Sequence, residues 1–312
     1  MVNRIEAKPL LTDKELRQLQ GTKPDTHLGY LILEEDVDVV CFETGADLLR
    51  FRKNILSNNH VINAYNALRT APRESDNRGI AGGILEKGIG EAVKGTEEIG
   101  QKSKFRYRVK KKDGTLSTTN RANPVASGIV GYWGRDPRFP YCRQCVWNVD
   151  NPDKWKQTIP LIKEVDKAYF DIAPNEYELQ KTEADKIHPD FRIADTVFST
   201  LTVNRDWQTA VHTDKGNVIA SNFSAIMTAF SAGKYDGCFT VFPKYKVGIN
   251  MRSKDLVVFN NHLHHANTPM IPKGAYERIS VVFYMRNGMQ NCQSAAKELE
   301  IAKVRQAGTP IY

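Results

Sequence analysis

Two short motifs and one isolated histidine in the C-terminal half of the chain carry the side chains best suited to chemistry. They are His212-Thr-Asp214, His265 and Arg278-Ile-Ser280. Two imidazoles and one carboxylate can hold Fe(II) on one face and leave its other coordination positions open. An arginine beyond them can bind a carboxylate through two parallel, charge-assisted hydrogen bonds. This set predicts an oxygenase that uses Fe(II), 2-oxoglutarate and O2.

The spacing of the first motif suits metal chelation, because side chains two residues apart on a strand point to the same face. His212 and Asp214 are therefore two expected ligands. Three histidines compete for the third position, namely His262, His264 and His265. We choose His265, which begins the short segment that faces the arginine motif across one turn. Calcium or magnesium would need more oxygen ligands, and zinc would bring no redox chemistry.

The second motif is expected to hold the co-substrate. Two iron positions would take the C1 carboxylate and C2 ketone of 2-oxoglutarate, and O2 would take the last. The far carboxylate would meet Arg278, with the Ser280 hydroxyl as a second donor, because the two residues share a strand face. Oxidative decarboxylation then yields a ferryl species that abstracts hydrogen from a C–H bond and rebounds as hydroxyl. The plainer alternatives are a surface turn for His-X-Asp and a surface arginine for Arg278.

The elements that must position these residues are mostly strands. From residue 191 onward the chain reads as short strands joined by Gly, Pro, Asn and Asp turns, with no helix between them. This pattern predicts a jelly roll or barrel rather than a parallel α/β sheet. The expected strands are 195–204, 208–212, 223–230, 238–242, 247–251, 256–260, 265–268 and 278–285.

Helices and a hairpin are expected around this core. We predict helices at 13–20, 46–71 (one or two helices), 152–173 and 294–307 from apolar periodicity. Residues 73–100, rich in Gly, predict a long surface loop, and 103–118, with Asp-Gly at its centre, predict a β-hairpin. The fold class is therefore mainly β with flanking helices (α+β). Residues 1–126 would form a support layer packed on a core of residues 127–312, in one compact unit.

Composition restricts the class of protein only broadly. The chain has 312 residues, 41% of them hydrophobic and 26% charged, and a net charge of +8, which favours a polyanionic partner weakly. Without a long apolar run or a secretory signal, we expect a cytoplasmic protein, of cellular or phage origin, that does not enter a membrane. Five cysteines, an odd number, indicate reduced thiols. Cys142 and Cys145 have the spacing of half a zinc site, with free thiols as the alternative.

Two longer stretches resemble a known family. Residues 196–217 (TVFSTLTVNRDWQTAVHTDKGN) and 239–289 are similar to the TET/JBP family of Fe(II)/2-oxoglutarate-dependent dioxygenases, closer to its J-binding-protein branch, with a weaker similarity at 127–145. The resemblance implies a double-stranded β-helix and oxidation of a pyrimidine 5-methyl group in nucleic acid, either thymine or 5-methylcytosine. It also implies His212, Asp214 and His265 as iron ligands and Arg278 as the co-substrate arginine.

A DNA substrate makes further demands, because a methyl group on a stacked base cannot reach a buried metal unless the base is flipped or the strand is single. Basic side chains must bind phosphates, and an apolar slot must hold the base. Candidates for the phosphates are Lys104, Arg106, Arg108 and Lys110, which could equally be a solvated edge strand. Candidates for the base slot are Phe223, Tyr235, Phe239 and Trp133, although aromatic residues of this kind are more often core residues. Asn217 and His262 are further candidates for contacts with the base.

Three functions remain open on these residues. The leading prediction is hydroxylation of a methylated pyrimidine in DNA. The same chemistry on a free base, nucleotide or other small molecule is the second. A non-catalytic DNA-binding protein on an oxygenase scaffold is the third, against which the intact ligand set and Arg278 argue.

Overall fold

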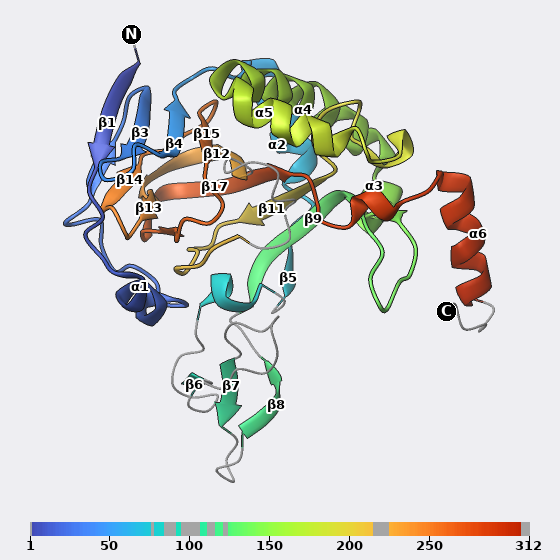
Figure 1. The fold of residues 1–312 in the computed structure, drawn as a ribbon, viewed down its shortest axis with the longest axis horizontal. Coiled ribbons are helices and arrows are strands. Elements are labelled where there is room, and N and C mark those ends of the chain that lie inside the picture. Colours follow the sequence, from blue (N-terminus) through green and yellow to red (C-terminus); the bar gives the residue numbers. More distant parts are fainter. Residues whose placement is uncertain are drawn as a thin grey trace.

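The main body of the protein consists of two sheets flanked on one side by helices (Figure 1). Its computed structural model describes residues 2–75, 78–83, 92–94, 107–110, 116–120, 124–214 and 225–306. Ten strands form the large sheet, with β5 (Arg73–Ser75) paired to β9 off the main path. Its path runs through β1 (Asn3–Ala7), β3 (Val37–Cys41), β4 (Asp47–Arg52), β15 (Leu256–Phe259), β12 (Ala225–Gly237), β17 (Met270–Tyr284), β11 (Thr200–Arg205), β9 (Val125–Trp133) and β10 (Arg143–Gln144).

The second sheet is small and completes the jelly roll. Its order is β16 (Ala266–Asn267), β13 (Thr240–Phe242), β14 (Val247–Ile249) and β2 (Leu31–Leu33). N-terminal strands join both sheets, since β4 pairs with β15 and β2 pairs with β14. The predicted jelly roll of mainly β structure with flanking helices is confirmed, and the boundary near residue 126 stays a prediction.

Strand β17 explains how a nearly continuous apolar run can serve two surfaces. It lies between β12 and β11, with Ser280 opposite Asn204 on β11. Alternate residues Ile279, Val281 and Phe283 enter the main hydrophobic core. The residues between them face the other way because side chains alternate along a strand.

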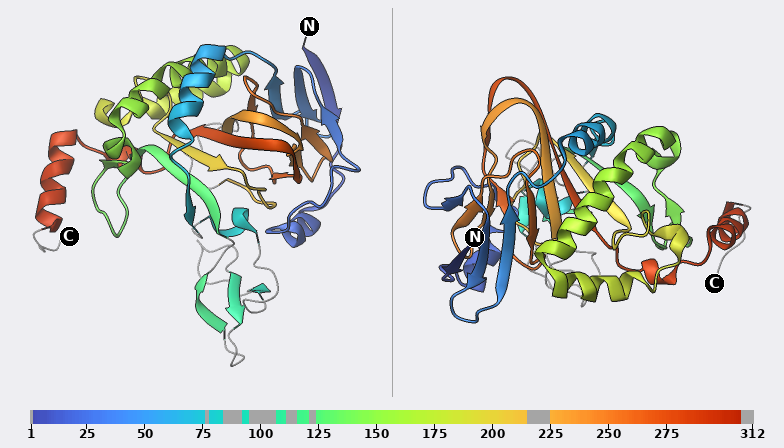
Figure 2. Two further views of the ribbon diagram at one scale, coloured as in Figure 1. Left: turned by 180° about the vertical axis from the view of Figure 1, so that it is seen from behind. Right: turned by 90° about the horizontal axis from the view of Figure 1, so that it is seen from above.

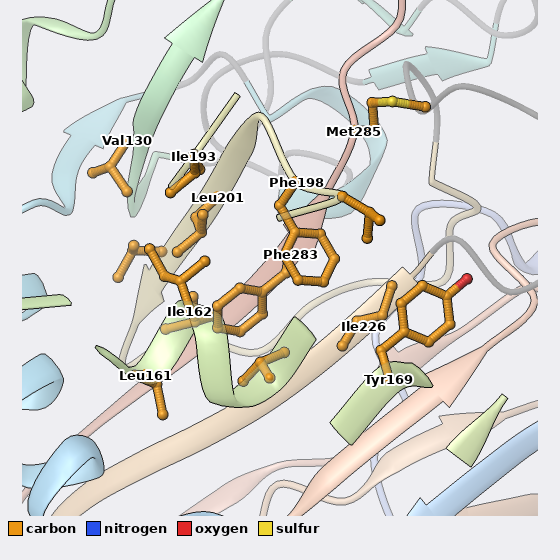
Figure 3. Packing of buried hydrophobic residues seen from close by; sticks show 14 of the residues in the cluster. Val130, Leu161, Ile162, Tyr169, Ile193, Phe198, Leu201, Ile226, Phe283 and Met285 are labelled. Carbon is orange, nitrogen blue, oxygen red and sulfur yellow. The ribbon is translucent and has the colours of Figure 1, made fainter. Parts of the chain in front are cut away.

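Helices cover the core face of the large sheet (Figure 2). They are α2 (Asn58–Leu68), α4 (Pro152–Ile172) and α5 (Pro174–Ala184). Figure 3 shows Tyr169 of α4 near Phe198 and Phe283, where the ring centroids of the two phenylalanines are 5.6 Å apart. Each buried aromatic side chain of this kind contributes about 2 kcal/mol by leaving water. This packing holds the sheet rigidly and thereby fixes the opposite face, which carries the site.

The predicted helices at 13–20, 152–173 and 294–307 are confirmed as α1 (Asp13–Leu19), α4 and α6 (Ala295–Gln306). The prediction of helix throughout 46–71 is wrong in its first part, because residues 47–52 form β4. Leu48, Leu49 and Phe51 are apolar at a spacing that fits a helix or a buried strand, and pairing with β15 selects the strand. Strand β9 was not predicted, and β12 and β17 begin or end well beyond the predicted segments.

The predicted hairpin at 103–118 is confirmed in its backbone. Strand β7 (Tyr107–Lys110) pairs antiparallel with β8 (Leu116–Asn120), and β6 (Ala92–Lys94) adds a third strand. This third sheet, of three strands, projects from the main body (Figure 1). In the predicted loop at 73–100, the described parts are β5, β6 and a 3-10 helix, η1 (Gly79–Gly82).

The prediction of reduced thiols is wrong for two cysteines. Cys142 is joined by a disulfide to Cys292, whose Cα lies 5.6 Å away. Cys145 remains a buried free thiol, so Cys142 and Cys145 do not form half of a zinc site. The tertiary fold brings Cys292 beside Cys142 from 150 residues away in sequence, and spacing along the chain carried no sign of that contact.

A buried carboxylate secures the same C-terminal segment. The Glu298 side chain on α6 is only 1% exposed and pairs with Arg135 at 2.7 Å. It also accepts hydrogen bonds from the backbone N–H groups of Cys142 and Gln293.

Among the helices in the described part of the chain, none combines the length and apolar character needed to cross a bilayer.

Candidate metal centre and its cavity

The two predicted metal-binding histidines lie side by side because their backbones pair. The N–H of His212 donates to the carbonyl oxygen of His265 at 3.0 Å, and the reverse hydrogen bond measures 2.9 Å. His265 directly precedes β16, so the small sheet positions it. Asp214 is held two residues further along by a hydrogen bond from its N–H to the carbonyl oxygen of Asn261. The fold therefore brings a distant histidine onto the His-X-Asp motif.

Both imidazoles are oriented for metal binding. Nδ1 of His212 lies 2.8 Å from the Ala210 carbonyl oxygen, and Nδ1 of His265 lies 3.0 Å from that of Leu263. A carbonyl oxygen only accepts, so each Nδ1 carries the proton and each Nε2 keeps a lone pair. This backbone contact is the arrangement that orients metal-binding histidines in general.

The lone pairs converge on one carboxylate. Nε2 of His212 is 3.6 Å from Oδ1 of Asp214, and Nε2 of His265 is 3.9 Å from Oδ2. Ligand atoms of the three residues all lie within 4.8 Å of one another, the one such cluster among the described residues. An ion about 2.1 Å from each ligand fits such a set. The donor types and their spacing thus match the predicted iron site.

The charge states also suit a cation. Burial and the neighbouring His212 lower the pKa of His265 to about 4, so this imidazole is neutral at pH 7. Burial alone would raise the pKa of Asp214, but its neighbours His212, His265 and Arg78 hold it below its usual value. The cluster therefore presents one anion and neutral imidazole nitrogen, as Fe(II) requires.

The three residues line a cavity of about 550 Å³ that lies between the two sheets. Small-molecule sites commonly measure roughly 300 to 1,000 Å³. One wall is the large sheet, including Asn204, Met227, Ser280 and Val282. The other wall includes the three candidate ligands His212, Asp214 and His265, called the metal cluster below, and two residues of the four-stranded sheet, Thr240 and Asn267. The jelly roll thus holds the cluster against the unpacked face of β17.

Arg278 lies on that same face, one alternation beyond Ser280. Its side chain is 4% exposed, and its Nε donates to the hydroxyl oxygen of Tyr235 at 3.1 Å. Its Nη2 is buried without a hydrogen-bond partner. A buried guanidinium with an unused donor is costly unless a ligand supplies an acceptor. This unused donor fits the far carboxylate of 2-oxoglutarate, with Ser280 lining the cavity between the arginine and the metal cluster.

A second group of cavity residues was largely missed from the sequence. Arg286 continues the alternation of β17 past its end, and Arg78 comes from the loop that precedes η1. Trp133 at the end of β9 and Tyr284 on β17 complete the group. The two-residue spacing from Ser280 through Tyr284 to Arg286 was a usable signal. Nothing in the sequence near Arg78 indicated its position.

The other predicted substrate residues lie in different environments, and those with described side chains do not line the cavity. Tyr235 is buried against Arg278 rather than open to a base. Phe239 packs edge-on against His27, with ring centroids 5.4 Å apart. His262 is exposed, while His264 bonds Gln20. Arg108 and Lys110 lie on β7, whose side chains are not described, and the following lie outside the described residues: Lys104, Arg106, Asn217 and Phe223.

Comparison with known proteins identifies the family. The model of Tet_JBP, the oxygenase domain of the 2OGFeDO superfamily, matches residues 129–287. The chain belongs to this family. Membership implies Fe(II) and 2-oxoglutarate as cofactors and agrees with the resemblance seen in the sequence. The matched residues include the metal cluster, Arg278 and the strands that carry them.

Individual relatives share the same region. The bifunctional helicase and thymine dioxygenase JBP2 of Leishmania tarentolae is 34% identical over 176 residues, which are 55% of this chain and 16% of the relative. Thymine dioxygenase JBP1-B of Trypanosoma cruzi is 29% identical over 75% of this chain and 28% of its own length. This chain therefore spans about a sixth to a quarter of these relatives.

A solved structure supports the fold. NgTET1 in complex with 5mC DNA aligns with a TM-score of 0.51, covering 94% of this chain and 99% of that one, at 11% identity. The agreement extends to nearly the whole length of both chains, so the N-terminal strands and the flanking helices belong to the shared architecture.

Proposed function

We propose that the protein is an Fe(II)/2-oxoglutarate-dependent dioxygenase that hydroxylates the 5-methyl group of a pyrimidine in DNA. One observation carries the proposal: the Nε2 atoms of His212 and His265 converge on Asp214 in a cavity walled by the same β17 face that bears Arg278. A set of three metal ligands and, on the same strand face, a buried guanidinium with an unused Nη2 donor are the two halves of a 2-oxoglutarate oxygenase site.

The residues of the site fit both the iron and 2-oxoglutarate. His212, Asp214 and His265 would hold the iron, and Arg278 with Ser280 would hold the far carboxylate of 2-oxoglutarate. When bound, the iron and the keto acid activate O2 and supply the oxidant for a C–H bond. The chain itself contributes orientation: the carbonyl oxygens of Ala210 and Leu263 fix both imidazole tautomers.

The chain also lines part of the site with apolar side chains. Met227 and Phe259 line the cavity beside the metal cluster, and Arg278 is almost completely buried. A water-poor site strengthens the arginine–carboxylate pair and prevents side reactions. The same apolar wall suits a substrate that offers a methyl group rather than a polar one.

DNA as the substrate is supported by two kinds of relatives. The JBP1 and JBP2 proteins are named thymine dioxygenases, and the NgTET1 structure holds DNA with 5-methylcytosine. The net charge of +8 suits a polyanion. The projecting sheet with β7, which carries Arg108 and Lys110, offers a basic strand for the phosphate backbone.

The direct test is mass spectrometry of nucleosides from DNA incubated with the protein, Fe(II) and 2-oxoglutarate. We expect a 5-hydroxymethyl pyrimidine with wild-type protein and none with Asp214→Ala. The exposed His262 lies next to the site in sequence but outside the metal cluster, so His262→Ala is the matched control and should retain product. Absence of any hydroxymethyl nucleoside from wild-type protein would refute a DNA substrate.

Salt distinguishes DNA from a free base or nucleotide. Each phosphate contact releases counterions, so turnover on DNA at limiting substrate should fall steeply between low and moderate salt. A neutral nucleoside would show almost no such dependence. Turnover that prefers nucleoside and ignores salt would transfer the proposal to a small-molecule substrate.

A further inference from the structure

The group of Arg78, Trp133, Tyr284 and Arg286 forms a distinct end of the cavity. Arg278 and Arg286 are eight residues apart on β17 and its extension, which is roughly 27 Å along an extended strand. Arg278 therefore lies beyond the Ser280 end of the face that lines the cavity, and the second group lies towards the other end of this face. A substrate must approach the metal cluster from a direction that the keto acid does not occupy, and this group lines that side.

The Arg286 guanidinium lies over an indole ring. Its guanidinium carbon lies 3.4 Å from the ring centroid of Trp133, and the Trp133 Nε1–H donates to Asp136. The backbone of Arg286 is fixed by a hydrogen bond from its N–H to Ser199 Oγ at 2.9 Å. No described residue accepts a hydrogen bond from its guanidinium, which therefore keeps its donor edge for a ligand.

The side chain of Arg78 is held by a chain of two hydrogen bonds. Its Nε donates to Ser127 Oγ at 2.7 Å, and that hydroxyl donates to Asn204 Oδ1 at 2.7 Å. Within the described residues its two Nη atoms make no hydrogen bond. Arg78 is close enough to Asp214 and Tyr284 to feel their charges, which places it beside the metal cluster.

The two arginines repel each other. Burial, opposed in part by Tyr284 and Asp214 and assisted by the charge of Arg286, lowers the pKa of Arg78. Two like charges with free donors in one cavity are unfavourable until a ligand brings acceptors. The arrangement therefore selects a ligand edge that accepts hydrogen bonds.

We propose that Arg78 and Arg286 read the C4 edge of the target base and make the site prefer thymine to 5-methylcytosine. The proposal rests on the proposed function. Thymine carries an oxygen acceptor at C4, and cytosine carries an amino donor there. C4 adjoins the C5 methyl group, so its substituent lies beside the metal cluster when the methyl group does, within reach of Arg78.

The discrimination follows from the donor-only chemistry of arginine. A guanidinium cannot accept a hydrogen bond, so an amino group at C4 would face it donor to donor and both would stay unpaired. A site built around a hydrogen bond rejects an analogue that lacks the partner strongly. Trp133, over whose ring Arg286 lies, holds that guanidinium in the cavity.

The test compares two oligonucleotides of one sequence, with thymine or 5-methylcytosine at a single target position. Hydroxymethyl product is measured by mass spectrometry to give kcat/KM for each base. We expect wild-type protein to prefer thymine, and Arg286→Gln and Arg78→Gln each to lower the ratio of thymine to 5-methylcytosine by about tenfold or more. Arg138→Gln is the matched control, since Arg138 is exposed, contacts Phe139 rather than the cavity, and should leave the ratio unchanged.

A binding assay, performed without metal, complements the turnover assay. Trp133 and Trp207, two of the four tryptophans, line the cavity, so tryptophan fluorescence reports on its occupation. The protein is titrated with thymidine 5′-monophosphate and with 5-methyl-2′-deoxycytidine 5′-monophosphate. Wild-type protein should bind the thymidine nucleotide more tightly, and Arg286→Gln should make the two affinities equal. Arg286→Lys keeps a donor and the charge, and should keep part of the preference.

Two results would overturn the inference while the proposed function stands. One is a wild-type preference for 5-methylcytosine. The other is an equal loss on both bases in Arg78→Gln and Arg286→Gln, which would assign the arginines to a phosphate. Absence of product from either oligonucleotide would instead remove the proposed function and this inference together.

Discussion

Replacing Arg278 by methionine should stabilise the ligand-free protein while abolishing its response to 2-oxoglutarate. Arg278 is 4% exposed, and its Nη2 lacks a partner. Substituting apolar side chains for buried ionic groups is often neutral or stabilising by about 1 to 4 kcal/mol. We therefore expect Arg278→Met to unfold at the same or a higher temperature than wild type when no ligand is present.

The loss of co-substrate binding should be large. Each hydrogen bond to a charged group contributes about 1.5 to 3 kcal/mol, so losing a two-bond clamp costs about 3 to 6 kcal/mol, or a hundredfold or more in affinity. Wild type at 2-oxoglutarate equal to 100 times its Kd gains about 2.7 kcal/mol of stability. Arg278→Met should gain almost none, and Arg278→Lys, a point charge without the planar fork, should fall between.

The assay is thermal unfolding with Fe(II) under anaerobic conditions, with and without 2-oxoglutarate. Arg252→Met is the matched control. Arg252 packs over the same Tyr235 ring and reaches its hydroxyl at 3.5 Å, but its shorter hydrogen bonds go to the backbone carbonyls of Met251 and Gly237. It should lose stability without ligand and keep the full 2-oxoglutarate shift. An Arg278→Met protein that is stabilised by 2-oxoglutarate as strongly as wild type would refute the assignment of this arginine.

Three further outcomes are expected. Asp214→Ala removes the anionic ligand and should abolish Fe(II) binding, measured by calorimetry, and retained binding would contradict the metal cluster. His265→Ala should lose metal whereas His262→Ala should not, and equal affinities would mean that the wrong histidine was chosen. Burial raises the pKa of Glu298, but Arg135 and two backbone N–H groups stabilise the carboxylate more strongly and hold this pKa below 4.5. Its ionised form therefore stabilises the protein at neutral pH. Glu298→Gln should cost about 1.5 to 3 kcal/mol at pH 7, and in denaturant titrations the difference should shrink as the pH falls below about 4.5. A difference that does not change with pH would exclude this linkage.

The chemistry of the site was readable from the sequence because it depends on residue types and short spacings. His-X-Asp and Arg-X-Ser place two side chains on one face of an extended chain whatever surrounds them. The strand pattern after residue 191 likewise follows from alternation and turn residues. The predicted hairpin was found for the same reason, since Asp113-Gly114 is a local turn signal.

Tertiary structure decided everything that depends on which distant segments meet. It selected His265 over His262 and His264 by pairing its backbone with His212. It turned Leu48, Leu49 and Phe51 into a strand, because pairing with β15 outweighs a spacing that also suits a helix. It joined Cys142 to Cys292 and brought Arg78 beside Arg286. Local spacing fixes the direction of a side chain relative to its neighbours in the chain, whereas burial and long-range pairing decide what that side chain meets.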